Sequence, residues 1–163
     1  MGASTGNMLV DRREALEDTF RTAASLSLPV MTHCEDSGII NENMRVAKEH
    51  FGDDPDITHH WEIRSAEACW ASSQLAVELA RKFKTQLHIA HITTAKELSL
   101  ANQTEDEGRI TLEAVIAQIA FSNEDDLTKK ALIKCNPSVK TVADRDAIRQ
   151  ALTDGRITVI GTD

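Results

Sequence analysis

Short apolar runs alternate with longer helical patterns along this chain, and that alternation is the strongest constraint on its fold. The four runs are residues 28–35, 85–94, 131–139 and 156–163, each rich in branched or apolar side chains. Runs of this length and composition are typical of strands buried on both faces of a parallel sheet. Strand–helix alternation therefore predicts an α/β fold with a parallel sheet.

Helical patterns fill much of the space between these runs. Residues 11–26 begin with Asp11 three residues before Glu14, which resembles a capping box. In residues 64–84 apolar side chains recur every three or four positions, and a third helix is predicted over 142–153.

Capping residues mark both ends of the last predicted helix. Two other segments show neither a helical nor a strand pattern. Thr141 is the expected N-cap of the helix, and Gly155 lies just beyond its end. Segments 36–62 and 99–127 are long and are interpreted as irregular loops of the kind that carry functional sites.

The charge and cysteine content narrow the range of partners. Asp and Glu number 26 against 18 Lys and Arg, a formal net charge of −8 over 163 residues, so nucleic acid and anionic membrane surfaces are not expected partners. No apolar run approaches the roughly 20 residues of a membrane helix. Three scattered cysteines without a CxxC pair favour a reducing, cytoplasmic compartment.

Polar side chains stand at the carboxyl ends of all four predicted strands. They are His33, His91, Asn136 before a proline, and Asp163. Parallel α/β folds bind ligands at this end of the sheet. Two imidazoles and a carboxylate suit zinc or a similar metal, so His33, His91 and Asp163 are the candidate metal ligands.

The two-residue alternation of a strand predicts on which face of the sheet each histidine lies. In 85–94, His91 is predicted to share a face with Leu87 and Ile89, while His88 points the other way, toward helices. Of the remaining histidines, His50 is interpreted as structural.

His59 and His60 form an adjacent pair that the strand phase does not place. They are interpreted as loop-surface side chains or as supports for the site.

Six segments in order resemble the dihydroorotases of the amidohydrolase superfamily. These are MGASTGNM (1–8), THCED (32–36), HHWEIRSAEAC (59–69), AHITT (90–94), KCNPSVK (134–140) and VIGTD (159–163). The resemblance covers essentially the whole chain, and it implies a (β/α)₈ barrel, of which residues 1–163 form a single partial domain with about strands five to eight.

The resemblance also implies an activity and roles for residues. The family reversibly hydrolyses the cyclic amide of dihydroorotate to carbamoyl aspartate, a small-molecule step in pyrimidine biosynthesis, with two metal ions that are usually zinc. By resemblance His33 and His91 match two histidine ligands, and Asp163 matches the aspartate that binds metal and shuttles the proton. Asn136 falls where the family contacts its substrate.

The chain also departs from the family pattern. The His-x-His pair of the first strand, the bridging carboxylated lysine and the substrate-binding arginine are absent, and Ala117-Gln118 stands where relatives often carry paired histidines. We therefore expect a fragment that is inactive alone. Its two open sheet edges should favour dimers or aggregates.

Two alternatives stay open. One is another cyclic amidohydrolase, such as a hydantoinase or an allantoinase, although Glu35-Asp36 after the first histidine favours dihydroorotase. The other is a non-catalytic, degenerate barrel half that acts as a structural partner.

Overall fold

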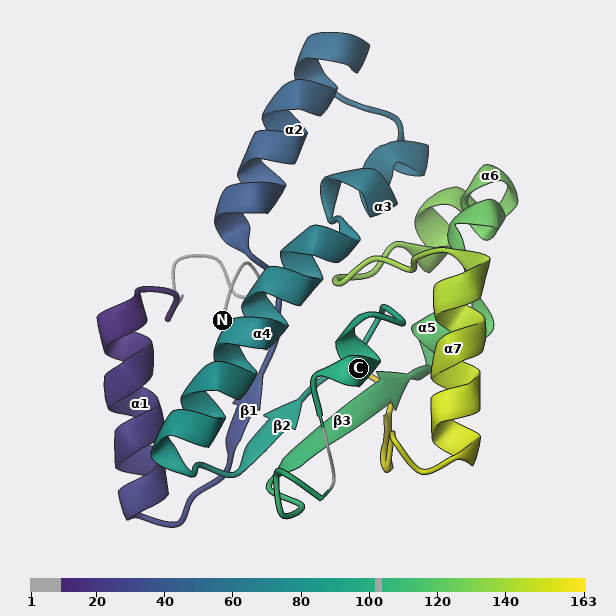
Figure 1. Cartoon of the computed structure of the whole chain (residues 1–163). Coiled ribbons are helices and arrows are strands. Elements are labelled where there is room, and N and C mark those ends of the chain that lie inside the picture. Colours follow the sequence, from purple (N-terminus) through teal and green to yellow (C-terminus); the bar gives the residue numbers. More distant parts are fainter. Residues whose placement is uncertain (1–9, 102–103) are drawn as a thin grey trace.

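A four-stranded parallel sheet forms the centre of the molecule. The computed structural model describes residues 10–101 and 104–163, so the resemblance in residues 1–8 lies outside the described residues. The strands are β1 (Val30–Thr32), β2 (Leu87–Ile89), β3 (Ile110–Val115) and β4 (Val159–Gly161), in the spatial order β1-β2-β3-β4 (Figure 1). Sequential parallel strands with helices between them confirm the predicted α/β fold and a partial barrel.

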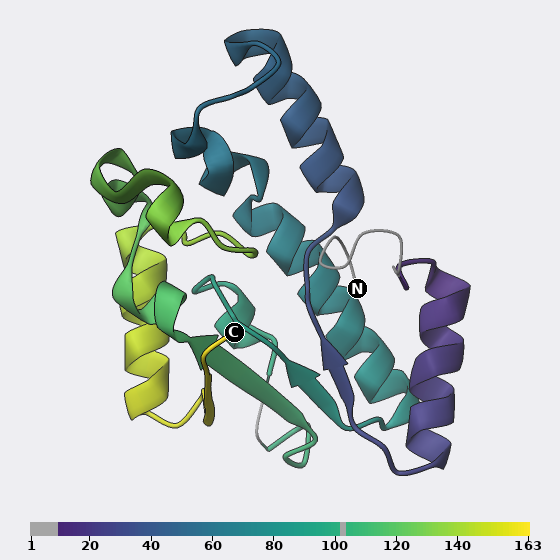
Figure 2. The same ribbon diagram turned by 180° about the vertical axis from the view of Figure 1, so that it is seen from behind.

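The strand register divides the sheet into two unlike faces. Leu87 pairs with Ile110, and the next pair is His88 with Thr111. Paired residues of parallel strands share a face, so the leucine and isoleucine lie on one face and the histidine and threonine on the other. The first face carries the core. The second face includes Met31, which is 66% exposed, and no helix of the described residues covers it in Figure 2.

Helices α1 (Arg13–Ser25), α4 (Ala66–Phe83) and α7 (Val142–Thr153) cover the apolar face. Branched side chains of the strands meet small and aromatic side chains of these helices in one buried cluster. Its members include Phe20, Ala76, Leu79, Ile89, Leu112, Ile148 and Ala151. Each of the larger side chains contributes roughly 1.5–3 kcal/mol when it leaves water, so this cluster fixes the sheet against the helices.

Helix ends follow local hydrogen-bonding chemistry. Thr141 and Asp144 form a capping box at the start of α7, and Gly155 has φ +83° just past its end, which confirms both predicted boundaries. Ser65 caps α4 by accepting from the Ala68 N–H. The expected cap at Asp11 is wrong, since α1 begins after Arg12, which makes no side-chain cap hydrogen bond.

The predicted strand over 131–139 is also wrong. Its first part belongs to a 3₁₀ turn, η4 (Lys130–Ile133), and Leu132 is 91% exposed. The third strand is β3 instead, inside the segment 99–127 interpreted as irregular. Its residues alternate between buried and half-buried, because one face packs on helices and the other does not.

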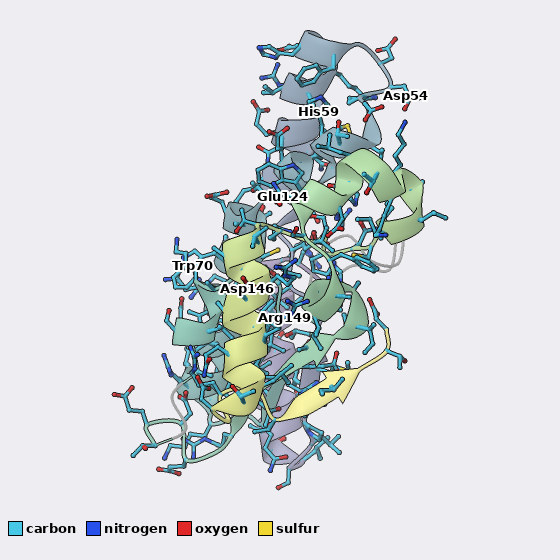
Figure 3. All side chains as sticks on the ribbon, turned by 90° about the vertical axis from the view of Figure 1, so that its right-hand side faces the viewer. Asp54, His59, Trp70, Glu124, Asp146 and Arg149 are labelled. Carbon is cyan, nitrogen blue, oxygen red and sulfur yellow. The ribbon has the colours of Figure 1, made fainter. Side chains whose placement is uncertain are left out.

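Segment 36–62 is likewise helical rather than irregular. It contains α2 (Ser37–Phe51), η1 (Ile57–His59) and α3 (His60–Ile63), and Asp36 caps α2 by accepting from the Ile39 N–H at 2.9 Å. In Figure 3 the labels Asp54 and His59 mark this excursion, well beyond the sheet.

Short helices lie between β2 and α7, in addition to β3 and η4. They are η2 (Glu97–Ser99), α5 (Ile116–Ala120), η3 (Asn123–Asp125) and α6 (Asp126–Lys129). Within the part of the chain that the structure describes, no helix is long and apolar enough to cross a membrane.

Candidate active site

Two imidazoles meet where β1 and β2 end. His33 Nδ1 lies 3.0 Å from His91 Nε2, and the ring centroids are 4.7 Å apart in an edge-to-face arrangement. The strands pair in parallel register, with Thr32 opposite Ile89, so the residues that leave the two strands emerge side by side. The adjacent strands thus bring together two histidines that lie 58 positions apart in the sequence.

Asp163 joins the two histidines at one cavity beyond the carboxyl ends of the strands. The cavity is lined by Met31, His33, Ala90, His91, Glu113, Gly161, Thr162 and Asp163. Three of the four sequence-predicted site residues therefore share one cavity at the sheet end where parallel folds bind ligands. Their roles toward a metal or substrate stay predictions.

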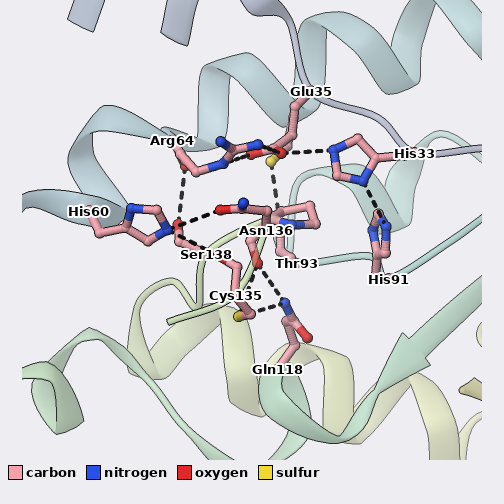
Figure 4. A network of polar contacts seen from close by, with 12 residues as sticks. His33, Glu35, His60, Arg64, His91, Thr93, Gln118, Cys135, Asn136 and Ser138 are labelled. Carbon is pink, nitrogen blue, oxygen red and sulfur yellow. Dashed lines mark hydrogen bonds and ion pairs between the residues drawn. The ribbon is translucent and has the colours of Figure 1, made fainter. Parts of the chain in front are cut away.

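His33 is held by a buried ion pair. Its Nε2 lies 2.8 Å from Glu35 Oε2, and Arg64 Nε donates to Glu35 Oε1 at 2.9 Å while Arg64 Nη2 bonds to Oε2 (Figure 4). Burial alone would raise the pKa of Glu35, but the hydrogen bonds from His33 and Arg64 and the positive charge of Arg64 lower it to about 2. The carboxylate is therefore ionised over the ordinary pH range.

His91 is held differently, by its backbone. It follows the end of β2 with φ +40°, a conformation that non-glycine residues seldom adopt and that is concentrated at functional sites. Its N–H donates to Glu113 Oε1 at 3.2 Å, whereas its side-chain Nδ1 is buried without a partner. Burial, and then the neighbouring His33, lower the pKa of His91, while Asp163 acts in the opposite direction.

The predicted orientation of His88 is wrong. His88 lies on the open face, with Nδ1 2.8 Å from Thr111 Oγ1 and Nε2 3.4 Å from Glu113 Oε2. Leu87 and Ile89 are the helix-facing residues of β2. The error came from extending the two-residue alternation through His91, although β2 ends at Ile89 and the chain turns before His91.

Asn136 lies in a loop, not on a strand, and it is not among the residues that line the cavity. Its Oδ1 is 3.1 Å from His60 Nε2, which also lies 3.0 Å from the Cys135 carbonyl. The same loop reaches the ion pair, since Ser138 Oγ donates to the Arg64 carbonyl at 3.2 Å (Figure 4). His60 thus supports the loop of Asn136.

Gln118 and His59 occupy other surroundings. The Gln118 amide donates to the Pro137 carbonyl at 2.9 Å, so this residue stabilises the Asn136 loop. His59 stacks on Phe51, with ring centroids 3.8 Å apart, in the α2–α3 excursion.

The histidine pair fits two ligands of a metal ion. Two nitrogens bound to one tetrahedral zinc at about 2.0–2.1 Å would lie roughly 3.3 Å apart, close to the observed 3.0 Å. No cluster of three or more His, Cys, Asp or Glu among the described residues is arranged to hold a metal. His33 and His91 are thus a pair at ligand distance from each other, and Asp163 lines the same cavity without completing a three-ligand set with them.

The sequence of the chain is similar to those of several curated proteins. No family model matches the chain. A dihydroorotase from Latilactobacillus sakei is 28% identical over 144 residues, covering 86% of this chain and 32% of that protein. A dihydroorotase from Syntrophobacter fumaroxidans is 31% identical over 169 residues, covering 99% and 35%. The chain is related to the dihydroorotases.

The chain also resembles an allantoinase in sequence and hydantoinases in fold. An allantoinase from Bacillus velezensis is 31% identical over 109 residues, which cover 66% of this chain and 24% of that protein. The solved L-hydantoinase from Arthrobacter aurescens superposes with a TM-score of 0.90 at 19% identity, covering 100% of this chain and 36% of that one. The chain spans about a third of the length of the dihydroorotases that it matches.

Three residues that hold the predicted ligands were not predicted from the sequence. Glu35 carries a weak signal, because it follows His33 by two positions at the end of the predicted strand 28–35. Glu113 lies within a strand that the sequence analysis interpreted as irregular. Arg64 is 29 positions from Glu35, and nothing local in the sequence pairs them.

Proposed function

We propose that this chain supplies half of the active site of a metal-dependent cyclic amidohydrolase of the dihydroorotase type. The observation that carries the proposal is the shared cavity of His33, His91 and Asp163, with the two imidazole nitrogens 3.0 Å apart. The sequence similarity to dihydroorotases over most of the chain supports dihydroorotate and carbamoyl aspartate as the substrate pair.

In this proposal His33 Nδ1 and His91 Nε2, with the Asp163 carboxylate, hold a metal ion, for which zinc is the family expectation. When bound, the metal would polarise the scissile carbonyl and make water a better nucleophile at neutral pH. The imidazoles must be neutral to serve as ligands, and burial already favours the neutral form of His91 by lowering its pKa.

The chain's own acid–base chemistry rests on Asp163. Its carboxylate lines the cavity, so it can take the proton of the attacking water and then pass it to the departing ring nitrogen. Asn136 would contact the substrate through its amide, from the loop that Ser138 and Gln118 anchor.

A hydantoinase or allantoinase activity is the second candidate. The allantoinase relative is as similar in identity as the Syntrophobacter dihydroorotase, and the hydantoinases share the fold. Glu35 and Asp36, which favoured dihydroorotase, turn out to support the ion pair and the α2 cap. Both roles are compatible with any of the three substrates, so only a substrate comparison separates them.

The test is hydrolysis of dihydroorotate, hydantoin and allantoin with added zinc. Each is assayed with this chain alone and with this chain mixed with the N-terminal barrel strands of the Syntrophobacter relative. We expect little turnover by the chain alone, because among the described residues no three His, Cys, Asp or Glu side chains are arranged to hold a metal ion. We expect dihydroorotate to be the preferred substrate of the mixture.

Asp163→Asn is the control for the proton transfer. An amide keeps an oxygen that can approach a cation but cannot accept the proton, so turnover should fall by about 10²–10⁴ while zinc content changes little. Near-normal turnover by this variant would remove Asp163 from the reaction. No hydrolysis of any of the three substrates by a zinc-loaded mixture would favour the non-catalytic barrel half.

A further inference from the structure

We propose that Glu35, clamped by Arg64, is a positioning residue that keeps the proton of His33 on Nε2 and leaves Nδ1 bare toward His91. This inference deepens the proposed function and rests on it for its purpose, since a bare Nδ1 is what a metal ligand requires. The assignment of the proton itself depends only on contacts among residues of this chain.

The first step is the contact between His33 and Glu35. His33 Nε2 lies 2.8 Å from Glu35 Oε2, and the glutamate side chain is fully buried. An ionised carboxylate can only accept hydrogen bonds, so the imidazole nitrogen that faces it must carry the proton. A neutral imidazole has a single N–H, and Nδ1 is therefore left with a free lone pair.

The second step is the clamp on Glu35. Arg64 bonds both carboxylate oxygens, through Nε to Oε1 at 2.9 Å and through Nη2 to Oε2, in the bidentate geometry that fixes a carboxylate plane. Arg64 is itself buried, and its carbonyl accepts from Ser138 Oγ. The carboxylate consequently has one orientation in which to receive the His33 proton.

The third step concerns where the bare nitrogen points. His33 Nδ1 faces His91 Nε2 at 3.0 Å, beside the cavity that both histidines line. A carboxylate that orients a metal-binding histidine through its other ring nitrogen is a recurring arrangement in metal sites. Here the arrangement is preformed, because both members of the ion pair are buried in the fold.

A purely structural ion pair is the competing interpretation, and the chain offers a matched control for it. Glu97 is another buried glutamate, which accepts from Ser73 Oγ at 2.6 Å and from Thr94 Oγ1 at 2.8 Å, and no histidine of the described residues bonds to its side chain. Removing either carboxylate should cost stability. Only the loss of Glu35 should alter the protonation pattern of His33.

The primary test requires no variant. A long-range ¹H–¹⁵N correlation spectrum of the chain, labelled at histidine and recorded near pH 8, distinguishes protonated from bare ring nitrogens. We expect His33 to have a protonated Nε2 and a bare Nδ1. A His33 with its proton on Nδ1, or an even mixture of tautomers, would overturn the proposal whatever the metal does.

The variants then test cause. In Glu35→Gln the side chain can also present an N–H₂ group to His33, so we expect a mixed tautomer and a 10- to 100-fold weaker zinc affinity by calorimetric titration. Glu97→Gln should keep the wild-type tautomer and zinc affinity. If both variants leave the tautomer of His33 unchanged, Glu35 does not set it and the inference fails.

A folding defect does not remove the test. If Glu35→Gln does not fold, because Arg64 is left unpaired, the double variant Glu35→Gln/Arg64→Met removes the buried charge and can be measured instead. The failure of the proposed function has a separate signature: the expected tautomer with no zinc-induced change at His33 Nδ1 would leave the positioning inference standing and contradict the metal centre.

Discussion

The ends of β1 and β2 deliver two histidines to the same cavity by different means. At the end of β1, side chains hold His33 through Glu35 and Arg64. At the end of β2, the backbone holds His91 at φ +40°, with Glu113 accepting its N–H, and the ring Nδ1 has no partner. The first arrangement is built from a charged pair in the core and the second from a strained turn.

This difference predicts that the contacts at the end of β1 contribute more to the free energy of unfolding than those at the end of β2. Taking a charge out of water is costly unless its partner stays in place, so damage to the Glu35–Arg64 pair should exceed damage to the Glu113 contact. It also indicates that His33 is preset while His91 can still rotate or exchange its proton when a ligand arrives.

Arg64→Ala should have the largest effect, because it leaves the buried Glu35 carboxylate without its cationic partner. We expect a loss of about 3–5 kcal/mol in the free energy of unfolding, measured by urea denaturation of the metal-free chain. Thr141→Ala, which removes the α7 capping box, serves as the matched variant at about 1 kcal/mol. Equal losses in the two variants would contradict the importance of the pair.

The pH dependence of stability should come next. The pKa of Glu35 is lowered from 4.5 to about 2 in the folded chain, so its stabilising contribution is present above the unfolded pKa and is lost as pH falls from about 5 toward 2. The full contribution is about 3 kcal/mol. Acid titrations of Arg64→Ala should lose most of this dependence, and an unchanged acid transition would show that other carboxylates govern it.

Glu113→Ala tests the β2 side of the comparison. It leaves the N–H of His91 without its acceptor, which should cost about 1–3 kcal/mol, less than Arg64→Ala. Hydrogen exchange at the His91 amide should become faster while that of residues in β1 does not. A loss larger than that of Arg64→Ala would reverse the ranking of the two strand ends.

Gly161→Ala should have the smallest effect. A Cβ at this position would lie 2.8 Å from Glu113 Cδ, so the carboxylate must move. Its end is flexible, so the expected cost is about 1 kcal/mol, at the lower end of the range for overpacking. The change should still weaken the Glu113–His91 hydrogen bond, which would shift the amide resonance of His91. An unchanged resonance would show that Gly161 does not influence this hydrogen bond.

Several strands and helices could be predicted from the sequence because they depend on local patterns. The short apolar runs 28–35 and 85–94 identified β1 and β2, and the capping chemistry at Thr141 located α7. The third strand was missed because ITLEAV alternates between two environments and resembles an amphipathic segment, whereas the continuous apolar run near Leu132 resembles a buried strand.

The residues that orient the two histidines do so through tertiary contacts, which no local sequence pattern predicts. Arg64 reaches Glu35 across 29 positions, and Glu113 reaches the His91 backbone across 22. Strand phase failed at His91 since the chain leaves the sheet before it. The motif residues could thus be predicted, and the groups that orient them could not.

Zinc-edge anomalous diffraction from crystals of the chain grown with zinc tests the central claim most directly, namely that His33 and His91 form part of a metal centre with Asp163. The account predicts a peak bonded to His33 Nδ1 and His91 Nε2 at about 2.0–2.1 Å, beside the Asp163 carboxylate, and its loss in His33→Ala. Zinc bound only elsewhere, with the two imidazoles still hydrogen-bonded to each other, would contradict it.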